Sequence, residues 1–257
     1  MGLSRFTPAN VWHRACVKAE IRSARSRLVE LRGGRDVCWT DEDARDPLVT
    51  IRIPCYDRGR TILERAMPSA LSQTYRNIEV LVVGDGATPE TVAAVESVRD
   101  PRVRFVNLPR SSYPRDEQKR WLVVGHGPMN YALRAARGSW ITPLDDDDEY
   151  TEDHVERLLA AAIERRLEFV YGQTEVVAPD GSRGILGRWP PELGGFTNGA
   201  LLYSTRLNFL RYDPASWRDQ VPADWNLWRR MMAAGVKMGF TEHVVYRYFP
   251  TTHVPEW

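Results

Sequence analysis

The chain has 257 residues, and its 35 lysines and arginines nearly balance its 34 aspartates and glutamates, giving a net charge of +1. This length is ample for one large α/β domain with a hydrophobic core. Because the charge is nearly balanced, the net charge gives no reason to expect nucleic acid as a partner. The three cysteines, Cys16, Cys38 and Cys55, form no CxxC pair. We therefore expect neither a disulfide scaffold nor a zinc site, and the pattern suits a reducing cytosol.

The sequence shows no membrane-spanning pattern. No run reaches about 18 apolar residues, and the N-terminus lacks the apolar core of a signal peptide. We expect a cytoplasmic protein that is at most peripheral to a membrane, at its inner face.

Residues 1–46 are expected to form a helical extension and linker in front of a main domain at 47–257. Apolar residues recur there at the four- and three-residue intervals of an amphipathic helix: Val17, Ile21, Ala24, Leu28 and Leu31. Gly33 and Gly34 would end this helix. Its other faces are strongly basic, so contact with a membrane surface or dimerisation is one interpretation. Packing against the main domain is the simpler one, and we favour it.

From residue 48 onward, strand and helix patterns alternate. The expected strands are 48–53, 79–83, 103–107 and 140–144; the expected helices are 61–75, 89–99 and 127–137. Pro54 should end the first strand, Pro68 should kink the first helix, and residues 109–126 should form a loop. This order predicts a doubly wound α/β sheet with its nucleotide-binding half at 47–150.

The second half, residues 151–257, is less regular and is expected to form the acceptor side. It contains expected helices at 153–166 and 223–234 and expected strands at 168–177, 183–188, 200–204 and 244–248. A glycine-rich loop at 189–199 could close over a donor. Three tryptophans are expected to shape the acceptor pocket together with this loop: Trp217, Trp225 and Trp228.

Four consecutive aspartates, Asp145 to Asp148, follow the apolar run 140–144. A charge run by itself is usually solvated surface. Carboxylates are also the preferred ligands of hard divalent cations. Their position favours the second interpretation, because open α/β sheets bind ligands at the carboxyl ends of their strands.

Other polar residues follow the first two strands and should lie at the same edge of the sheet. Tyr56 offers an aromatic face, Arg58 a cation and Asp85 a hydrogen-bond acceptor. With the aspartates, this set is suited to a nucleoside diphosphate and a divalent ion. The sequence has no GxxxxGK[ST] and no GxGxxG loop, so the nucleotide should be held neither as in P-loop proteins nor as in dinucleotide-binding proteins.

Four segments, in this order and spacing, resemble the family 2 glycosyltransferases of the GT-A fold: Val49–Arg58 (VTIRIPCYDR), Ser72–Gly86 (SQTYRNIEVLVVGDG), Ala136–Asp148 (ARGSWITPLDDDD) and Ala223–Trp228 (ADWNLW). The resemblance covers about residues 48–250. It implies a GT-A type, doubly wound mixed sheet and a DxD-containing enzyme that uses a nucleotide sugar, most often UDP-linked.

The resemblance also implies roles for individual residues in donor binding. The segment Cys55, Tyr56 and Arg58 would cradle the nucleotide base, with Tyr56 against the ring. Asp85 would bind the base as well. Asp145 and Asp146 would lie at the ribose and the diphosphate.

For the chemistry, the resemblance implies that Asp147 ligates Mn²⁺ or Mg²⁺ and that Asp224 is the general base of an inverting transfer. The alternative for Asp224 is an ordinary helix cap, which is common at such positions. The family often places a metal-binding histidine near the C-terminus, where this chain has Phe249. His253 could take that role, and His243 is less suited because it precedes the last strand.

Two further departures and two alternative functions remain at this point. Gly84 stands where the family has the first aspartate of an acidic pair, so that contact is absent, and Cys55 replaces a frequent threonine.

A sugar nucleotidyltransferase also binds a nucleotide and Mg²⁺ at strand ends, but it usually carries a basic, glycine-rich loop that this chain lacks. A non-catalytic nucleotide-sugar-binding module is the other alternative. The acceptor could be a glycan, a lipid-linked sugar or a natural product.

Overall fold

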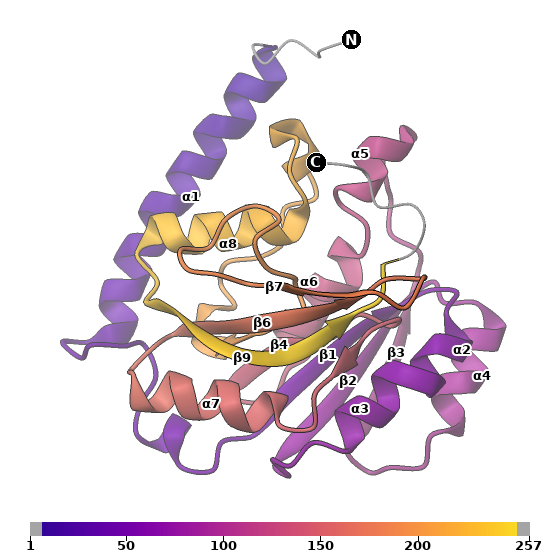
Figure 1. Cartoon of the computed structure of the whole chain (residues 1–257). Coiled ribbons are helices and arrows are strands. Elements are labelled where there is room, and N and C mark those ends of the chain that lie inside the picture. Colours follow the sequence, from indigo (N-terminus) through magenta and orange to yellow (C-terminus); the bar gives the residue numbers. More distant parts are fainter. Residues whose placement is uncertain (1–6, 251–257) are drawn as a thin grey trace.

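The computed structural model of the chain describes residues 7–250 (Figure 1). Its strands are β1 (Val49–Cys55), β2 (Ile78–Asp85), β3 (Val103–Leu108), β4 (Trp140–Pro143), β5 (Glu149–Tyr150), β6 (Phe169–Val177), β7 (Arg183–Leu186), β8 (Leu201–Ser204) and β9 (Met238–Tyr248). Its helices are α1 (Pro8–Arg32), α2 (Gly59–Thr61), α3 (Met67–Leu71), α4 (Pro89–Ser97), α5 (Glu117–Trp121), α6 (His126–Ala135), α7 (His154–Glu164) and α8 (Ala223–Ala234). Four shorter helical segments complete it: η1 (Glu42–Ala44), η2 (Ile62–Ala66), η3 (Thr205–Leu207) and η4 (Ser216–Asp219).

The strands form one mixed sheet in the order β3-β2-β1-β4-β8-β6-β9-β5, with β7 paired to β6. The first four of these strands are parallel, as the alternation of strands and helices predicts. Antiparallel β8 then reverses the direction between β4 and β6. The carboxyl ends of β1, β2 and β4 therefore lie at one edge of the sheet, next to the point where its direction changes.

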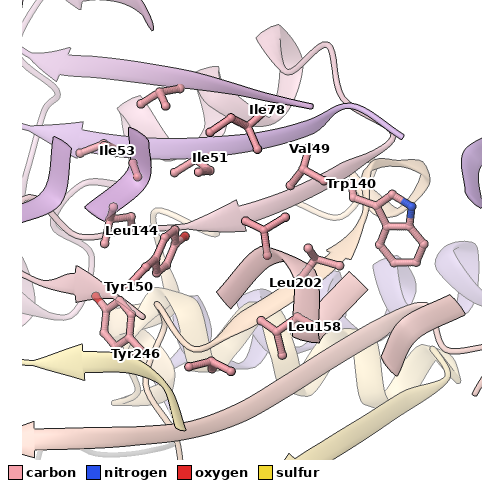
Figure 2. Close-up of a cluster of buried hydrophobic side chains, with 14 of the residues drawn as sticks. Val49, Ile51, Ile53, Ile78, Trp140, Leu144, Tyr150, Leu158, Leu202 and Tyr246 are labelled. Carbon is pink, nitrogen blue, oxygen red and sulfur yellow. The ribbon is translucent and has the colours of Figure 1, made fainter. Parts of the chain in front are cut away.

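Helices cover both faces of the sheet (Figure 1). Short helices α2, α3 and α4 and helix α7 cover one face; α6, α8 and α1 lie on the other. The larger core lies on the first face, where Ile51 and Ile53 of β1 pack with Leu158 of α7 and Tyr246 of β9 (Figure 2). Because side chains alternate along a strand, Thr50 and Arg52 point to the opposite face.

Helix α1 packs against α8, so the interpretation of a helix docked on the main domain is confirmed. Leu28 is buried, and Gly33 ends the helix in a left-handed conformation with φ 51°. Two of the basic side chains are used for docking. Arg25 donates to the Ala233 carbonyl at 2.7 Å, and Arg32 forms an ion pair of 2.7 Å with buried Glu168. No helix within residues 7–250 is long and apolar enough to cross a membrane.

Several predicted boundaries are wrong for identifiable reasons. Strand β1 continues through Pro54, which has no N–H to donate. Pairing with β4 ends at Arg52, so an N–H at Pro54 is not needed on the β4 side of the strand. The helical region ends at Leu71. Before Pro68 it widens into the π-turn η2, in which Met67 N–H bonds the Ile62 carbonyl.

Helix α5 and strand β5 were not predicted, and strand β9 is longer than expected. The expected loop at 109–126 contains α5, a helix of 5 residues that begins at Glu117 and is capped by the side chain of Asp116. Strand β5 has only 2 residues. Strand β9 begins at Met238, before the expected residue 244, because pairing with β6 supports a polar stretch that lacks an apolar pattern.

Candidate active site

The predicted site residues converge at the carboxyl edge of the parallel strands. The segment Tyr56–Arg58 follows β1, Asp85 ends β2, and Asp145 to Asp147 follow β4. The guanidinium of Arg58 contacts the Asp147 carboxylate and lies 3.8 Å from that of Asp146. Burial raises the pKa of Asp146 to about 7, although the charge of Arg58 opposes this effect. A single half-exposed arginine therefore faces several carboxylates, which leaves the cluster with an excess of negative charge.

The outer members of the aspartate run have different environments. Asp145 accepts a 3.4 Å hydrogen bond from the Asn198 side-chain amide, which belongs to the loop before β8. Asp148 is buried and accepts from the Tyr246 hydroxyl at 2.7 Å and from the Phe249 N–H at 2.8 Å. Asp148 thus fixes the C-terminal strand, whereas Asp145 faces the center of the site.

Asp224 lies in the first turn of α8, where its carboxylate accepts the Trp225 N–H at 2.6 Å. Pro222, not Asp224, precedes the first helical residue, so the simple N-cap alternative does not describe this position. Burial, together with the nearby charge of Asp145, raises the pKa of Asp224 to about 6. An aspartate from α8 and one from the run after β4 are therefore electrostatic neighbours.

Tyr56 and Asp85, which are expected at the nucleotide base, contact the segment 110–113, part of the expected loop 109–126. Arg110 stacks on Tyr56, with its guanidinium carbon 3.5 Å from the ring centroid. Asp85 is buried and accepts from Ser111 N–H at 2.8 Å and from the Tyr113 hydroxyl. In this structure Asp85 anchors residues 110–113, and Arg110 covers the face of Tyr56.

Two departures from the family pattern have a structural reason. The thiol of Cys55 lies in the core on the α7 side, where burial raises its pKa to about 12, so only the backbone of Cys55 can face a nucleotide. At Gly84 a Cβ atom would lie 2.4 Å from the Asn107 side-chain oxygen. That amide instead accepts the Ala87 N–H at 2.8 Å and shapes the turn after β2.

The expectation for the tryptophans is wrong for one of them. Trp228 is buried in the core with Phe169 and Tyr203 at centroid distances of 5.3 and 5.7 Å. Trp225 is partly exposed and packs on Phe196 of the loop 189–199, at 6.2 Å.

Two further residues near the site, Arg52 and Tyr212, are not among the predicted site residues. Arg52, in the middle of β1, is completely buried and donates to the Tyr212 hydroxyl and, at 3.5 Å, to Asn198. A charged residue inside an otherwise apolar strand was the available signal. Tyr212 is held by a reciprocal pair of hydrogen bonds to Asn130, of 2.8 and 2.9 Å, which no periodicity predicts.

The chemistry around Asp147 fits a divalent cation. In this structure the Asp147 carboxylate is paired with the Arg58 guanidinium, so a divalent cation there would replace the guanidinium as its partner. Within residues 7–250, no group of three or more histidine, cysteine, aspartate or glutamate side chains is arranged to hold a metal ion. His253 lies outside the described residues, so its role remains a prediction.

Comparison with known proteins is consistent with this geometry. The succinoglycan biosynthesis protein ExoO of Rhizobium meliloti is 33% identical over 170 residues, which are 63% of this chain and 45% of that protein. The Escherichia coli protein WfgD, a UDP-Glc:alpha-D-GlcNAc-diphosphoundecaprenol beta-1,3-glucosyltransferase, is 30% identical over 132 residues, 51% of this chain and 47% of that protein. The chain thus spans less than half the length of these relatives.

Solved structures share the fold. The Staphylococcus aureus TarS 1-349 structure in complex with UDP-GlcNAc has a TM-score of 0.60 at 18% identity, covering 80% of this chain and 59% of that one. The mannosyltransferase PcManGT from Pyrobaculum calidifontis, in complex with GDP-Man and Mn²⁺, has a TM-score of 0.57 at 16% identity, covering 93% and 68%. The mixed sheet is therefore of the GT-A type, with a helical N-terminal segment. Residues 50–216 match the model of glycosyl transferase family 2, and the chain belongs to that family.

Proposed function

We propose that this chain transfers a sugar from a nucleoside diphosphate sugar, UDP-linked, to an acceptor hydroxyl with inversion at the anomeric carbon. Residues 47–150 would bind the donor and residues 151–257 would form the acceptor side. The observation that carries the proposal is that the loop 189–199 contacts both halves: its Asn198 donates to Asp145, from the run after β4, and its Phe196 packs on Trp225, which follows Asp224 in α8. The loop therefore connects the proposed base of the acceptor half with the carboxylates of the donor half.

In this proposal Asp224 is the general base. The acceptor hydroxyl becomes acidic only as its bond to the anomeric carbon forms, so a carboxylate is a sufficient base. Burial raises the pKa of Asp224 to about 6, so the group is ionised at neutral pH and is more basic than an exposed aspartate. A single displacement by a hydroxyl from the opposite face inverts the anomeric carbon.

Donor binding would use the edge of the parallel strands. Tyr56 and the Cys55 backbone would contact the base, and Asp85 would bind it after rearrangement of the segment 110–113. Asp146 would lie at the ribose and diphosphate, near Arg58. A bound Mn²⁺ or Mg²⁺ at Asp147 would supply Lewis-acid neutralisation of the diphosphate leaving group.

The acceptor is proposed to be a lipid-linked sugar, with a glycan or a natural product as the alternatives. One relative acts, by its name, on a sugar attached to diphosphoundecaprenol. Exposed side chains on α1 support contact with a membrane surface. Trp12 is 72% exposed, and Lys18, six residues further along the helix, is exposed as well. Flotation with anionic vesicles should retain the wild type and lose Trp12→Ala/Lys18→Glu; equal retention would favour dimerisation or no role for this surface.

A thermal-shift panel with and without Mn²⁺ tests the donor assignment. Stabilisation by UDP that depends on Mn²⁺ supports it, whereas stabilisation by nucleoside triphosphates alone would indicate a nucleotidyltransferase. Asp147→Ala should lose the Mn²⁺ dependence, and Glu149→Gln, a neighbouring carboxylate change, should keep it. Asp224→Asn should keep the UDP shift and lose sugar transfer. Substantial turnover by Asp224→Asn would refute the base assignment, and UDP binding without any turnover by the wild type would indicate a binding module.

A further inference from the structure

The carboxylate of Asp85 is bound by donors of its own chain. One oxygen, Oδ1, accepts from the Ser111 N–H at 2.8 Å and from the Ser111 hydroxyl at 2.6 Å. The other oxygen, Oδ2, accepts from the Tyr113 hydroxyl and lies 3.4 Å from the Arg110 guanidinium. Because a carboxylate has about four acceptor sites, these four donors use its capacity. An N–H group of a nucleotide base could therefore bind Asp85 only by displacing one of them.

The same segment covers the aromatic face that is expected to hold the base. The guanidinium carbon of Arg110 lies 3.5 Å from the Tyr56 ring centroid, and Nη1 of Arg110 donates to the Asp85 main-chain carbonyl at 3.0 Å. Planar groups in contact are about 3.5 Å apart, so a base between Tyr56 and Arg110 would need a separation of about 7 Å. Arg110 and a base on this face of Tyr56 therefore exclude each other.

Side-chain contacts, and no strand pairing, hold this segment in place. Residues 109–114 belong to no helix or strand. The Tyr113 hydroxyl accepts the Gly125 N–H at 3.0 Å, and the Tyr113 ring packs edge-on against His126 at the start of α6, at a centroid distance of 5.3 Å. The segment can consequently leave Asp85 without the loss of any hydrogen bond within the sheet.

We propose that residues 110–113 are an internal placeholder for the nucleotide base, and that the donor binds by displacing them from Tyr56 and Asp85. This inference rests on the proposed function, since it takes Tyr56 and Asp85 as the contacts of the base. A ligand that binds only when a segment has moved has its apparent affinity reduced by the fraction of molecules in which the site is open. Weakening the hold of the segment should therefore strengthen donor binding.

The first test is the Kd for UDP in the presence of Mn²⁺, measured by calorimetry for Tyr113→Phe. This variant keeps the ring and loses the hydrogen bond to Asp85. A hydrogen bond to a charged group favours the state that contains it by about tenfold, so the Kd for UDP should fall about threefold to tenfold. If Tyr113→Phe does not fold, Ser111→Ala replaces it, because it also removes a hydroxyl donor to Asp85.

Tyr75→Phe is the matched control for this measurement. It also removes a tyrosine–aspartate hydrogen bond, of 3.1 Å to Asp46, but both residues precede strands and lie at the opposite edge of the sheet. Its Kd for UDP should equal that of the wild type.

A reversible lock tests the same step from the other direction. A Cβ atom at Gly127, a helical residue of α6, would lie 3.2 Å from the Ser111 Cβ, close to the separation of about 3.5–4.5 Å in disulfides. Ser111→Cys/Gly127→Cys is made in a Cys16→Ser background, which removes the exposed native thiol. The oxidised protein should bind UDP at least about tenfold more weakly than the same protein after reduction. Cys16→Ser alone should bind UDP equally in both conditions.

Unchanged or weaker UDP binding by folded Tyr113→Phe would overturn the placeholder and leave the proposed function standing, since residues 110–113 would then support the site or lie outside it. Equal UDP affinity of the oxidised and reduced double-cysteine protein would overturn it as well. If neither the wild type nor Tyr113→Phe binds UDP with Mn²⁺, the proposed function and this inference both fail.

Discussion

Asp224→Asn should stabilise the protein at neutral and alkaline pH while it removes the proposed base. The carboxylate is desolvated in the folded state, and burial raises its pKa from 3.8 to about 6. A group whose pKa is higher in the folded state loses stability as the pH rises, because folding then opposes ionisation. Asparagine does not titrate, and its side-chain oxygen can still accept the Trp225 N–H.

The size of the effect follows from the pKa. A difference of about two units corresponds to about 3 kcal/mol at 1.36 kcal/mol per unit. Asp224 is partly exposed to solvent, so screening reduces this value to about 1–2 kcal/mol. The gain should be fully present above about pH 7 and absent below about pH 4, where the carboxyl is protonated in both states.

Urea unfolding at several pH values between 4 and 8 measures this difference directly. Asp41→Asn, the same substitution at an exposed carboxylate, is the control and should show no pH-dependent gain. A stability difference for Asp224→Asn that is equal at pH 4 and pH 8 would refute the reasoning, because it would show that the carboxyl is not desolvated.

Two other predictions concern groups away from the transfer site. Glu168 is fully buried and bound by the Arg32 guanidinium, so Glu168→Gln should lower the free energy of unfolding by about 3 kcal/mol in urea titrations; an unchanged midpoint would contradict this. At pH 8 a thiol reagent should modify exposed Cys16 in the folded protein, and Cys38 and Cys55 only after unfolding, since burial raises the pKa of both to about 12. Prompt labelling of all three thiols would show that the two sites open readily.

The parallel half of the fold was predictable because its strands are apolar runs and because residues typical of helix N-termini mark where its helices begin. Thr88 caps α4, and Pro89 follows it at the first helical position, as the sequence suggests. The aspartate run was located for the same reason, since β4 points it to the edge of the sheet. Periodicity failed where pairing between distant strands determines the structure, as in β9.

The candidate site was predictable only as far as motifs and strand ends extend. Asn198, Arg110 and Tyr212 come from loops or irregular segments, whose paths depend on long-range hydrogen bonds. Arg110, for example, reaches Tyr56 because Asp85 fixes the segment after Arg110 through Ser111 and Tyr113. Such contacts join residues that are far apart in the sequence, and no local pattern encodes them.

Two buried charged residues on neighbouring strands differ in how well their hydrogen-bond partners compensate the charge. Glu79 of β2 accepts from Thr50 and Arg104, each at 2.7 Å, and from the Arg137 N–H. These three groups all donate hydrogen bonds to the Glu79 carboxylate. They compensate its buried charge, so Glu79 is explained by the stability of the sheet. Arg52 of β1, by contrast, has two guanidinium nitrogens, Nε and Nη1, without hydrogen-bond partners among the described residues, and it reaches Asp145 only through Asn198. The buried charge of Arg52 is therefore less completely compensated than that of Glu79.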